Sequence, residues 1–260
     1  MTRAGILAGQ TAIVTGAAQG LGAAFARRLA AEGCNVVITD RQPSVSDLAA
    51  AIGATAHVGD VADADHVRAV VDATIEAHGS IDILVNNAGE IWPTGVRGSW
   101  AQADDDFDRL FGSNVKGHFL FGRAVAASMI EAGRGHMVNI STDHVKPAPD
   151  TKRHHGHGHM DLYNASKWAI NGLTFDWAVS LARHGIRVNA LCMGATDTEM
   201  LRGFLGDDPD PEYVATWHRP EETAQVLVDL LAEGPDGRTG DMIGLYAGEP
   251  CVLPPPSHST

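Results

Sequence analysis

Tyr163 and Lys167 are the pair of residues with the clearest chemical potential, four positions apart at the start of a helical pattern. This spacing places both side chains on one face of a helix. A phenol titrates near ~10 in water, so it serves as a base at neutral pH only when a cation stabilises its anion. Lys167 can supply that cation. The pair indicates proton transfer to or from a substrate oxygen, although a solvated surface pair is the alternative.

A glycine-rich segment covers residues 15–22, between a strand pattern and a helix pattern. Its glycines allow a tight turn and a close approach to a pyrophosphate, while the helix amino terminus offers free N–H groups. Spaced glycines alone are a weak signal, but the flanking elements supply the expected context. The segment predicts a dinucleotide site with these contacts: Gly16, Gln19, Gly20, Leu21 and Gly22.

The next strand pattern ends at Asp40, about 20 residues beyond the glycines. A carboxylate at that position accepts hydrogen bonds from the adenosine ribose hydroxyls and repels a 2′-phosphate. NAD is therefore favoured over NADP, with Arg41 leaving some tolerance for the phosphate. An aspartate that merely begins a turn is the alternative.

Two further strand ends carry small or polar residues that suit a flat ligand against the backbone. The first is the pair at 60–61, and the second is Asn-Asn-Ala-Gly at 86–89. We interpret Asn86 as structural. The predicted cofactor contacts are Asp60, Val61, Asn87, Ala88 and Gly89.

These residues lie between apolar runs of strand length and amphipathic stretches of helix length, which alternate along the chain. Strands are expected at 11–15, 35–40, 55–59, 81–86, 135–141, 187–193 and 241–245. Helices are expected at 21–32, 45–52, 64–78, 104–131, 163–184 and 220–232. The pattern predicts one α/β domain over residues 1–260, with a doubly wound sheet of seven parallel strands and helices on both faces.

Segments 143–160 and 194–217 lack helical or strand periodicity, and each follows the carboxyl end of a strand. Ligands bind at that edge of an open parallel sheet, so we interpret both segments as walls of a substrate site. The proline-rich tail, 250–260, is expected to lie extended on the surface.

The net charge and the cysteine content of the chain disfavour several classes of function. The chain has 19 Lys and Arg against 32 Asp and Glu, a formal charge of −13, which disfavours nucleic-acid and acidic-membrane partners. Its three cysteines form no CxxC pair and favour a reducing compartment. Without a leader pattern or a long apolar run, we expect a cytoplasmic protein with no membrane partner.

In their order and intervals, four motifs closely resemble the short-chain dehydrogenase/reductase family, whose members have a Rossmann fold. The motifs are Thr15–Gly22, the Asn-Asn-Ala-Gly at 86–89, Asn114, and Tyr163 with Lys167. The resemblance covers nearly the whole chain. It implies that Tyr163 exchanges a proton with the substrate oxygen. It also implies that Lys167 lowers the pKa of Tyr163 and binds the nicotinamide ribose, and that Asn114 holds a water that relays protons.

The resemblance also implies a serine at the end of the fifth strand, where this sequence departs from the family. The alignment places Thr142 at the position that hydrogen-bonds the substrate oxygen, with Ser141 as the alternative. The usual Pro-Gly after the sixth strand is Met-Gly, and the segment before Tyr163 is longer than the family norm. The remaining cofactor contacts implied are Gly194, Thr196 and Thr198.

A histidine-rich tract at 154–159 invites a metal interpretation. Its glycines make a preformed site costly, so we predict no metal site and interpret the tract as a mobile lid. Trp92 is the tryptophan placed for ligand contact.

These observations predict an NAD-dependent oxidoreductase that transfers a hydride between nicotinamide and a secondary alcohol or ketone, with cyclic and aromatic substrates as candidates. A non-catalytic dinucleotide-binding sensor or scaffold of the same fold is the alternative. Long apolar-faced helices at 104–131 and 163–184 suggest a homo-oligomer, a tetramer or a dimer.

Overall fold

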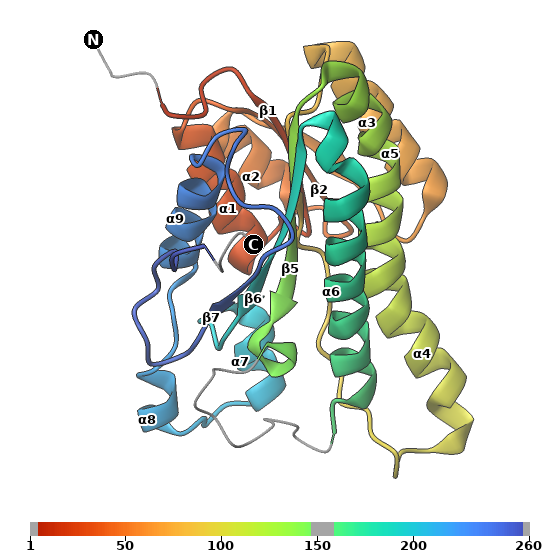
Figure 1. Ribbon diagram of the computed structural model, residues 1–260. Coiled ribbons are helices and arrows are strands. Elements are labelled where there is room, and N and C mark those ends of the chain that lie inside the picture. Colours follow the sequence, from red (N-terminus) through yellow and green to blue (C-terminus); the bar gives the residue numbers. More distant parts are fainter. Residues whose placement is uncertain (1–4, 147–158, 257–260) are drawn as a thin grey trace.

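The computed structural model describes residues 5–146 and 159–256 and has a central parallel sheet (Figure 1). Its strand order is β3-β2-β1-β4-β5-β6-β7, and every neighbouring pair is parallel. The strands are β1 (Thr11–Thr15), β2 (Asn35–Asp40), β3 (Thr55–Val58), β4 (Ile83–Asn86), β5 (Gly135–Thr142), β6 (Ile186–Met193) and β7 (Met242–Leu245). The predicted seven-stranded doubly wound sheet is confirmed. The strand order reverses between β1 and β4, and such a switch point opens a crevice at the carboxyl ends of the strands.

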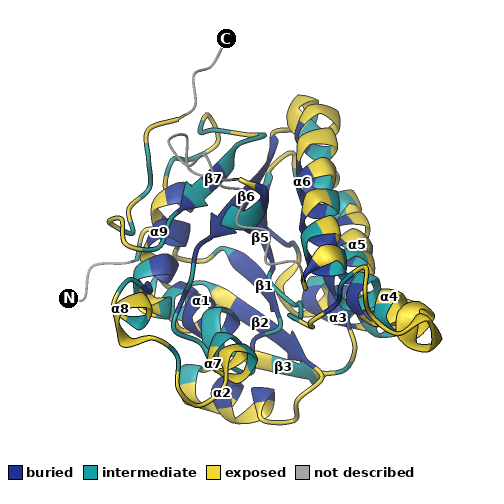
Figure 2. Ribbon diagram, turned by 90° about the horizontal axis from the view of Figure 1, so that it is seen from below, coloured by how far each residue is buried: buried dark blue, intermediate teal, exposed yellow. Residues whose placement is uncertain are grey.

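Helices cover both faces of the sheet (Figures 1 and 2). One layer holds α1 (Gly20–Ala31), α2 (Val45–Ile52) and α9 (Pro220–Leu231). The other holds α3 (Ala64–His78), α5 (Gly117–Ala132) and α6 (Asp161–Leu181). Alternate strand residues enter the two layers, as Ile13 and Val14 of β1 do. Every residue of β1 and β6 is buried, as expected for central strands that are covered on both faces, and most of these residues are apolar.

The predicted helix at 104–131 is helical throughout but has two parts. Helix α4 (Ala103–Phe111) passes through a π-helical turn, Gly112–Lys116, into α5. Asn114 lies in this turn and is completely buried. A π turn accommodates one extra residue within a helix, and such turns are common at functional sites.

The expectation of no helix within 194–217 is wrong. The segment contains α7 (Glu199–Leu205) and α8 (Pro211–Val214). Thr198 caps α7 by accepting from Leu201 N at 3.3 Å, and Asp210 caps α8 by accepting from Glu212 N at 2.9 Å. Helices this short show no periodicity in the sequence, and α8 has a proline in its first turn.

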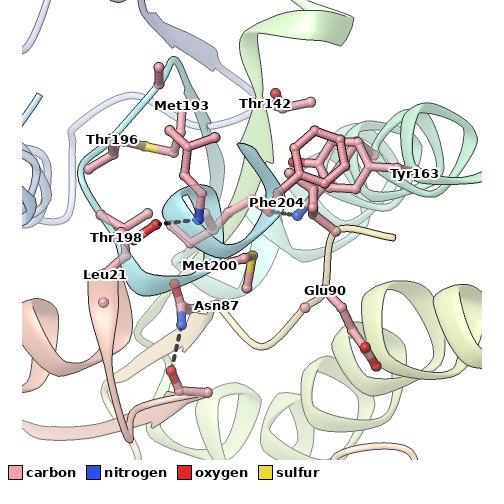
Figure 3. A pocket seen from close by; sticks show the side chains of 18 of the residues that line it. Leu21, Asn87, Glu90, Thr142, Tyr163, Met193, Thr196, Thr198, Met200 and Phe204 are labelled. Atoms are coloured by element: carbon pink, nitrogen blue, oxygen red, sulfur yellow. Dashed lines mark hydrogen bonds between the residues drawn. The ribbon is translucent and has the colours of Figure 1, made fainter. Parts of the chain in front are cut away.

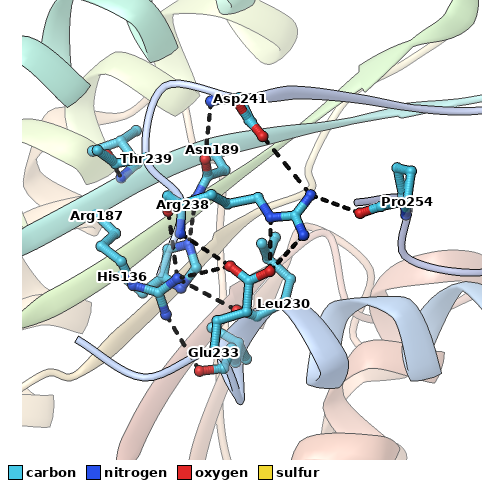
Figure 4. Close-up of polar contacts among 11 residues, drawn as sticks. His136, Arg187, Asn189, Leu230, Glu233, Arg238, Thr239, Asp241 and Pro254 are labelled. Carbon is cyan, nitrogen blue, oxygen red and sulfur yellow. Dashed lines mark hydrogen bonds and ion pairs between the residues drawn. The ribbon is translucent and has the colours of Figure 1, made fainter. Parts of the chain in front are cut away.

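A polar cluster lies beside β6 and the start of β7 (Figure 4). Arg238, whose side chain is buried, forms an ion pair with Glu233 and donates to Pro254 O at 2.9 Å. Asn189 of β6 donates to Arg238 O and accepts from Asp241 N. The cluster attaches the C-terminal segment to the sheet. Residues 250–256 contain no helix or strand, as expected, and the rest of the tail lies outside the described residues.

Candidate active site

A cavity of about 770 Å³ opens at the carboxyl edge of the sheet (Figure 3). It is large enough for a dinucleotide-sized ligand, since ligand pockets commonly measure ~300–1,000 Å³. Gly22 and Asn114 lie outside its lining. The predicted site residues that line it are Gly16, Gln19, Gly20, Leu21, Asp40, Arg41, Asp60, Val61, Asn87, Ala88, Gly89, Ser141, Thr142, Tyr163, Lys167, Gly194, Thr196 and Thr198.

The glycine turn has the geometry that a phosphate cradle requires. Gly16 and Gly20 have φ of +64° and +55°, a region that favours glycine. A Cβ on Gly16 would lie 2.7 Å from Ala88 Cα, and one on Gly22 would lie 2.1 Å from Gly16 O. Gln19 at the N-cap of α1 makes no side-chain capping bond. The first N–H groups of α1 are thus available to an anion, so the residues fit a dinucleotide pyrophosphate.

Asn87 holds this turn against the end of β4. Its side-chain Nδ2 donates to Thr15 O at 2.9 Å and to Gly16 O at 3.0 Å. Asn86, by contrast, is buried and donates to His118 O and Asn139 Oδ1, which suits the structural role that we expected. The two neighbouring asparagines therefore face different parts of the fold.

Asp40 lies at the end of β2 and is buried except for 8% of its surface. Its carboxylate accepts from Ala18 N at 3.0 Å and from Gln42 N at 2.9 Å. The second bond begins a turn, so the alternative interpretation also describes part of its role. Both bonds orient the carboxylate at the cavity wall, where each oxygen can accept a further hydrogen bond.

Tyr163 and Lys167 extend from the first turns of α6 into the cavity. Lys167 Nζ donates to Ile140 O at 2.9 Å and lies 5.6 Å from the centroid of the Tyr163 ring. The Thr142 hydroxyl at the end of β5 lies beside the Tyr163 phenol. Figure 3 shows Thr142 and Tyr163 on the same side of the cavity.

Burial dominates the ionisation of this pair. It raises the pKa of Tyr163 to about 12, while the neighbouring Thr142 hydroxyl acts in the opposite direction. Burial lowers the pKa of Lys167 to about 8. The lowering of the Tyr163 pKa by Lys167 that the family resemblance implied is not among the causes of this shift, which desolvation dominates. The phenol is protonated at neutral pH and can donate its proton.

Ser141 and Thr142 both line the cavity, but their surroundings differ. Strand β5 extends through Thr142, one residue beyond the expected end. Ser141 pairs with Cys192 of β6, and its hydroxyl lies beside that thiol. Thr142, the last residue of the strand, is the one of the two that lies beside Tyr163.

The amide group of Asn114 forms hydrogen bonds with three residues, two of them with the main chain of Glu90. Its Oδ1 accepts from Glu90 N at 2.8 Å and from the Ser113 hydroxyl at 3.0 Å. Its Nδ2 donates to Glu90 O at 3.1 Å and to the Ser166 hydroxyl at 3.0 Å. The side chain thus fixes the backbone after Gly89, beside Lys167.

Several cavity residues were not identified from the sequence. They include Met160, Met193, Phe204, Tyr213 and Tyr246. Their scattered positions along the chain carried no motif, although the Met at 193 had been noted as a departure. Glu90 is a further unpredicted lining residue.

Two expectations about the loops have different outcomes. Trp92 does not line the cavity but stacks on Arg109, whose guanidinium carbon lies 3.8 Å from its ring centroid. Residues 154–158 of the histidine tract lie outside the described residues. Within 5–146 and 159–256, no group of three or more His, Cys, Asp or Glu could hold a metal ion.

A family model described as short chain dehydrogenase matches residues 10–208. The chain belongs to the short-chain dehydrogenase/reductase family. It is 35% identical to Oxidoreductase UcpA of Escherichia coli (strain K12), over 91% of this chain and 84% of the relative. It is 32% identical to cis-4-hydroxycyclohexanecarboxylate dehydrogenase of Sinomonas cyclohexanicum, over 94% and 97% of the two chains.

A solved structure of this family is similar throughout. A short-chain type dehydrogenase/reductase from Mycobacterium marinum superposes with a TM-score of 0.79 at 28% identity, covering 93% of this chain and 95% of that one. As a short-chain dehydrogenase/reductase, the chain is an oxidoreductase of a family whose members bind nicotinamide dinucleotides. Among its described helices, none is sufficiently long and apolar to span a membrane.

Proposed function

We propose that this enzyme is an NAD-dependent oxidoreductase that interconverts a secondary alcohol and a ketone, with Tyr163 as the general acid and base. The observation that carries the proposal is the buried Tyr163, which lies beside Thr142 and one helical turn from Lys167, in the same cavity as the glycine turn. The bound nicotinamide would supply or accept the hydride.

In the reducing direction, Tyr163 donates its hydroxyl proton to the carbonyl oxygen. The Thr142 hydroxyl donates a second hydrogen bond to that oxygen as negative charge develops there. Lys167, anchored at Ile140 O, then faces a phenolate, and the positive charge of its ammonium group stabilises that anion. In the oxidising direction the same groups act in reverse.

The choice of NAD is supported by Asp40. Its carboxylate is aimed along the cavity wall by the two backbone N–H groups of Ala18 and Gln42. It can accept hydrogen bonds from ribose hydroxyls, whereas a 2′-phosphate would meet a fixed negative charge. Gly194, Thr196 and Thr198 also line the cavity and are proposed to hold the nicotinamide end.

The substrate class is supported by the walls beyond Tyr163. Methionine and aromatic side chains at Met160, Met193, Phe204 and Tyr213 suit an apolar ring. One relative is named as a dehydrogenase of a hydroxycyclohexane carboxylate. Cyclic secondary alcohols are therefore the first substrates to test.

The test is a panel of cyclic, aromatic and acyclic secondary alcohols incubated with the enzyme and NAD+ or NADP+, with the reduced nicotinamide measured spectroscopically. We expect turnover with at least one cyclic alcohol and a higher kcat/KM for NAD+. Tight dinucleotide binding without turnover across the panel, in both reaction directions, would favour the sensor or scaffold instead.

A further inference from the structure

Glu90 follows the Ala-Gly turn at the end of β4 and has a fixed position. Asn114 holds both its main-chain N–H and its carbonyl. Its side chain is only 11% exposed and points away from Tyr163 (Figure 3). Glu90 therefore presents a carboxylate toward the adenosine side of the cavity and not toward the reacting atoms.

Arg109 of α4 fixes one oxygen of that carboxylate. Glu90 Oε2 accepts from Arg109 Nε at 2.9 Å and from Nη2 at 2.7 Å. Arg109 is itself held against the Trp92 ring, and Trp92 Nε1 donates to Asp106 at 3.2 Å. Because Arg109 contacts Oε2, the other carboxylate oxygen of Glu90, Oε1, can bind a different residue.

That partner is Arg41, the residue after Asp40. Its Nη1 donates to Glu90 Oε1 at 3.2 Å, and its side chain is 61% exposed. Burial acts to raise the pKa of Glu90, but hydrogen bonds and charges from Arg109 and Arg41 outweigh it, so the pKa is lowered. The carboxylate is ionised at neutral pH and pairs with a flexible cation that lines the cavity.

We propose that Glu90 is a second determinant of cofactor specificity. Its ion pair with Arg41 keeps that cation from binding the 2′-phosphate of NADP. Arg41 is the cationic lining residue adjacent to Asp40, and an arginine is well suited to phosphate. Specificity depends on the difference between the affinities for NAD and NADP. The loss of an attraction between Arg41 and the 2′-phosphate therefore adds to the repulsion of that phosphate by Asp40. The inference rests on the proposed NAD-dependent function.

The test is a double-mutant cycle on Glu90→Gln and Arg41→Ala, with dissociation constants for NAD+ and NADP+ measured by calorimetry. We expect Glu90→Gln to improve the affinity for NADP+ relative to NAD+ by about fivefold, the size of an exposed ion pair. Adding Arg41→Ala should remove this gain. Arg41→Ala alone should leave NADP+ affinity nearly unchanged, because Glu90 already holds that cation.

Two controls make the result specific. Glu76→Gln, on the exposed face of α3, removes the same charge at a remote position and should not alter the ratio. Asp40→Ala should itself improve NADP+ binding, and adding Glu90→Gln should improve it further by a similar factor.

An unchanged ratio in Glu90→Gln, or an equal gain with Arg41→Ala present, would overturn the role of Glu90 and leave the proposed function intact. If Glu90→Gln does not fold, the Arg41→Ala single variant decides. A severalfold loss of NADP+ affinity in that variant would mean that Arg41 is already available, which overturns the inference. Failure of the unaltered enzyme to bind either dinucleotide would overturn both proposals.

Discussion

Thr142 occupies the position at which a hydroxyl can assist Tyr163, and its contact distinguishes it from Ser141. We predict that Thr142→Ser retains substantial activity because the donor survives. Thr142→Val should lose on the order of a hundredfold in kcat through a missing oxyanion-type hydrogen bond. Ser141→Ala is the matched control and should remain active. Steady-state kinetics showing a dead Ser141→Ala and an active Thr142→Val would reverse the assignment.

The ionisation of Tyr163 predicts the pH dependence of the two directions. With its pKa raised to about 12 by burial, the phenol is protonated below that pH in the described state. Alcohol oxidation requires the deprotonated form, so its kcat/KM should rise with pH through the mildly alkaline range. Ketone reduction uses the protonated form and should not rise. Parallel profiles in the two directions would contradict Tyr163 as the titrating group.

Residues of the cavity lining could be predicted where a motif lies at the end of a recognisable strand or helix. The Tyr163 and Lys167 spacing, the glycine turn and Asp40 each combine a residue type with the end of a recognisable element. Glu90 had no such signal, because its role depends on Arg41 and Arg109, which come from two other elements. The choice between Ser141 and Thr142 depended on where β5 ends, and strand ends are not fixed by apolar pattern.

At the scale of elements, the turn between β1 and α1 depends on glycines that cannot carry a side chain. Gly22→Ala would place a Cβ 2.1 Å from Gly16 O, so the backbone of the turn must shift. We predict a loss of NAD+ affinity of about tenfold or more, since such overpacking costs ~1–3 kcal/mol.

Gly203→Ala is the matched control, because a Cβ there meets no atom within 4 Å on helix α7. It should bind NAD+ as the unaltered enzyme does in a calorimetric titration. Equal affinities for the Gly22→Ala and Gly203→Ala variants would show that the turn is not part of the dinucleotide site.

The elements themselves were predicted with uneven success for physical reasons. All seven strands and the long helices have apolar patterns that are long enough to be recognised in the sequence. The structure contains each of these elements. The π turn around Asn114 and the short helices α7 and α8 have no such pattern, because they are stabilised by single side-chain contacts and caps. Two of the cavity walls therefore could not be derived from periodicity.

At the scale of the whole molecule, helix α6 has an exposed apolar face opposite the active site contacts. Trp168, Phe175 and Val179 are 60%, 60% and 68% exposed, and their spacing places them on one side of the helix. Exposed apolar faces of this kind mark association surfaces. We propose that copies of this chain associate through α6 as a dimer or tetramer.

The prediction for light scattering at micromolar concentration is a mass of two or four times 27.4 kDa. Phe175→Glu should shift the mass toward the monomer, because it would bury a charge in the interface. An exposed control at Glu76→Gln should leave it unchanged. A monomeric mass for the unaltered chain would refute association.

The central claim is that Tyr163 transfers the proton in an NAD-dependent reaction, and Tyr163→Phe tests it most directly. The ring remains and only the titrating hydroxyl is removed, so NAD+ affinity measured by calorimetry should be nearly unchanged. With the best alcohol from the panel, kcat should fall on the order of a thousandfold. Wild-type turnover in this variant, with NAD+ still bound, would contradict the mechanism.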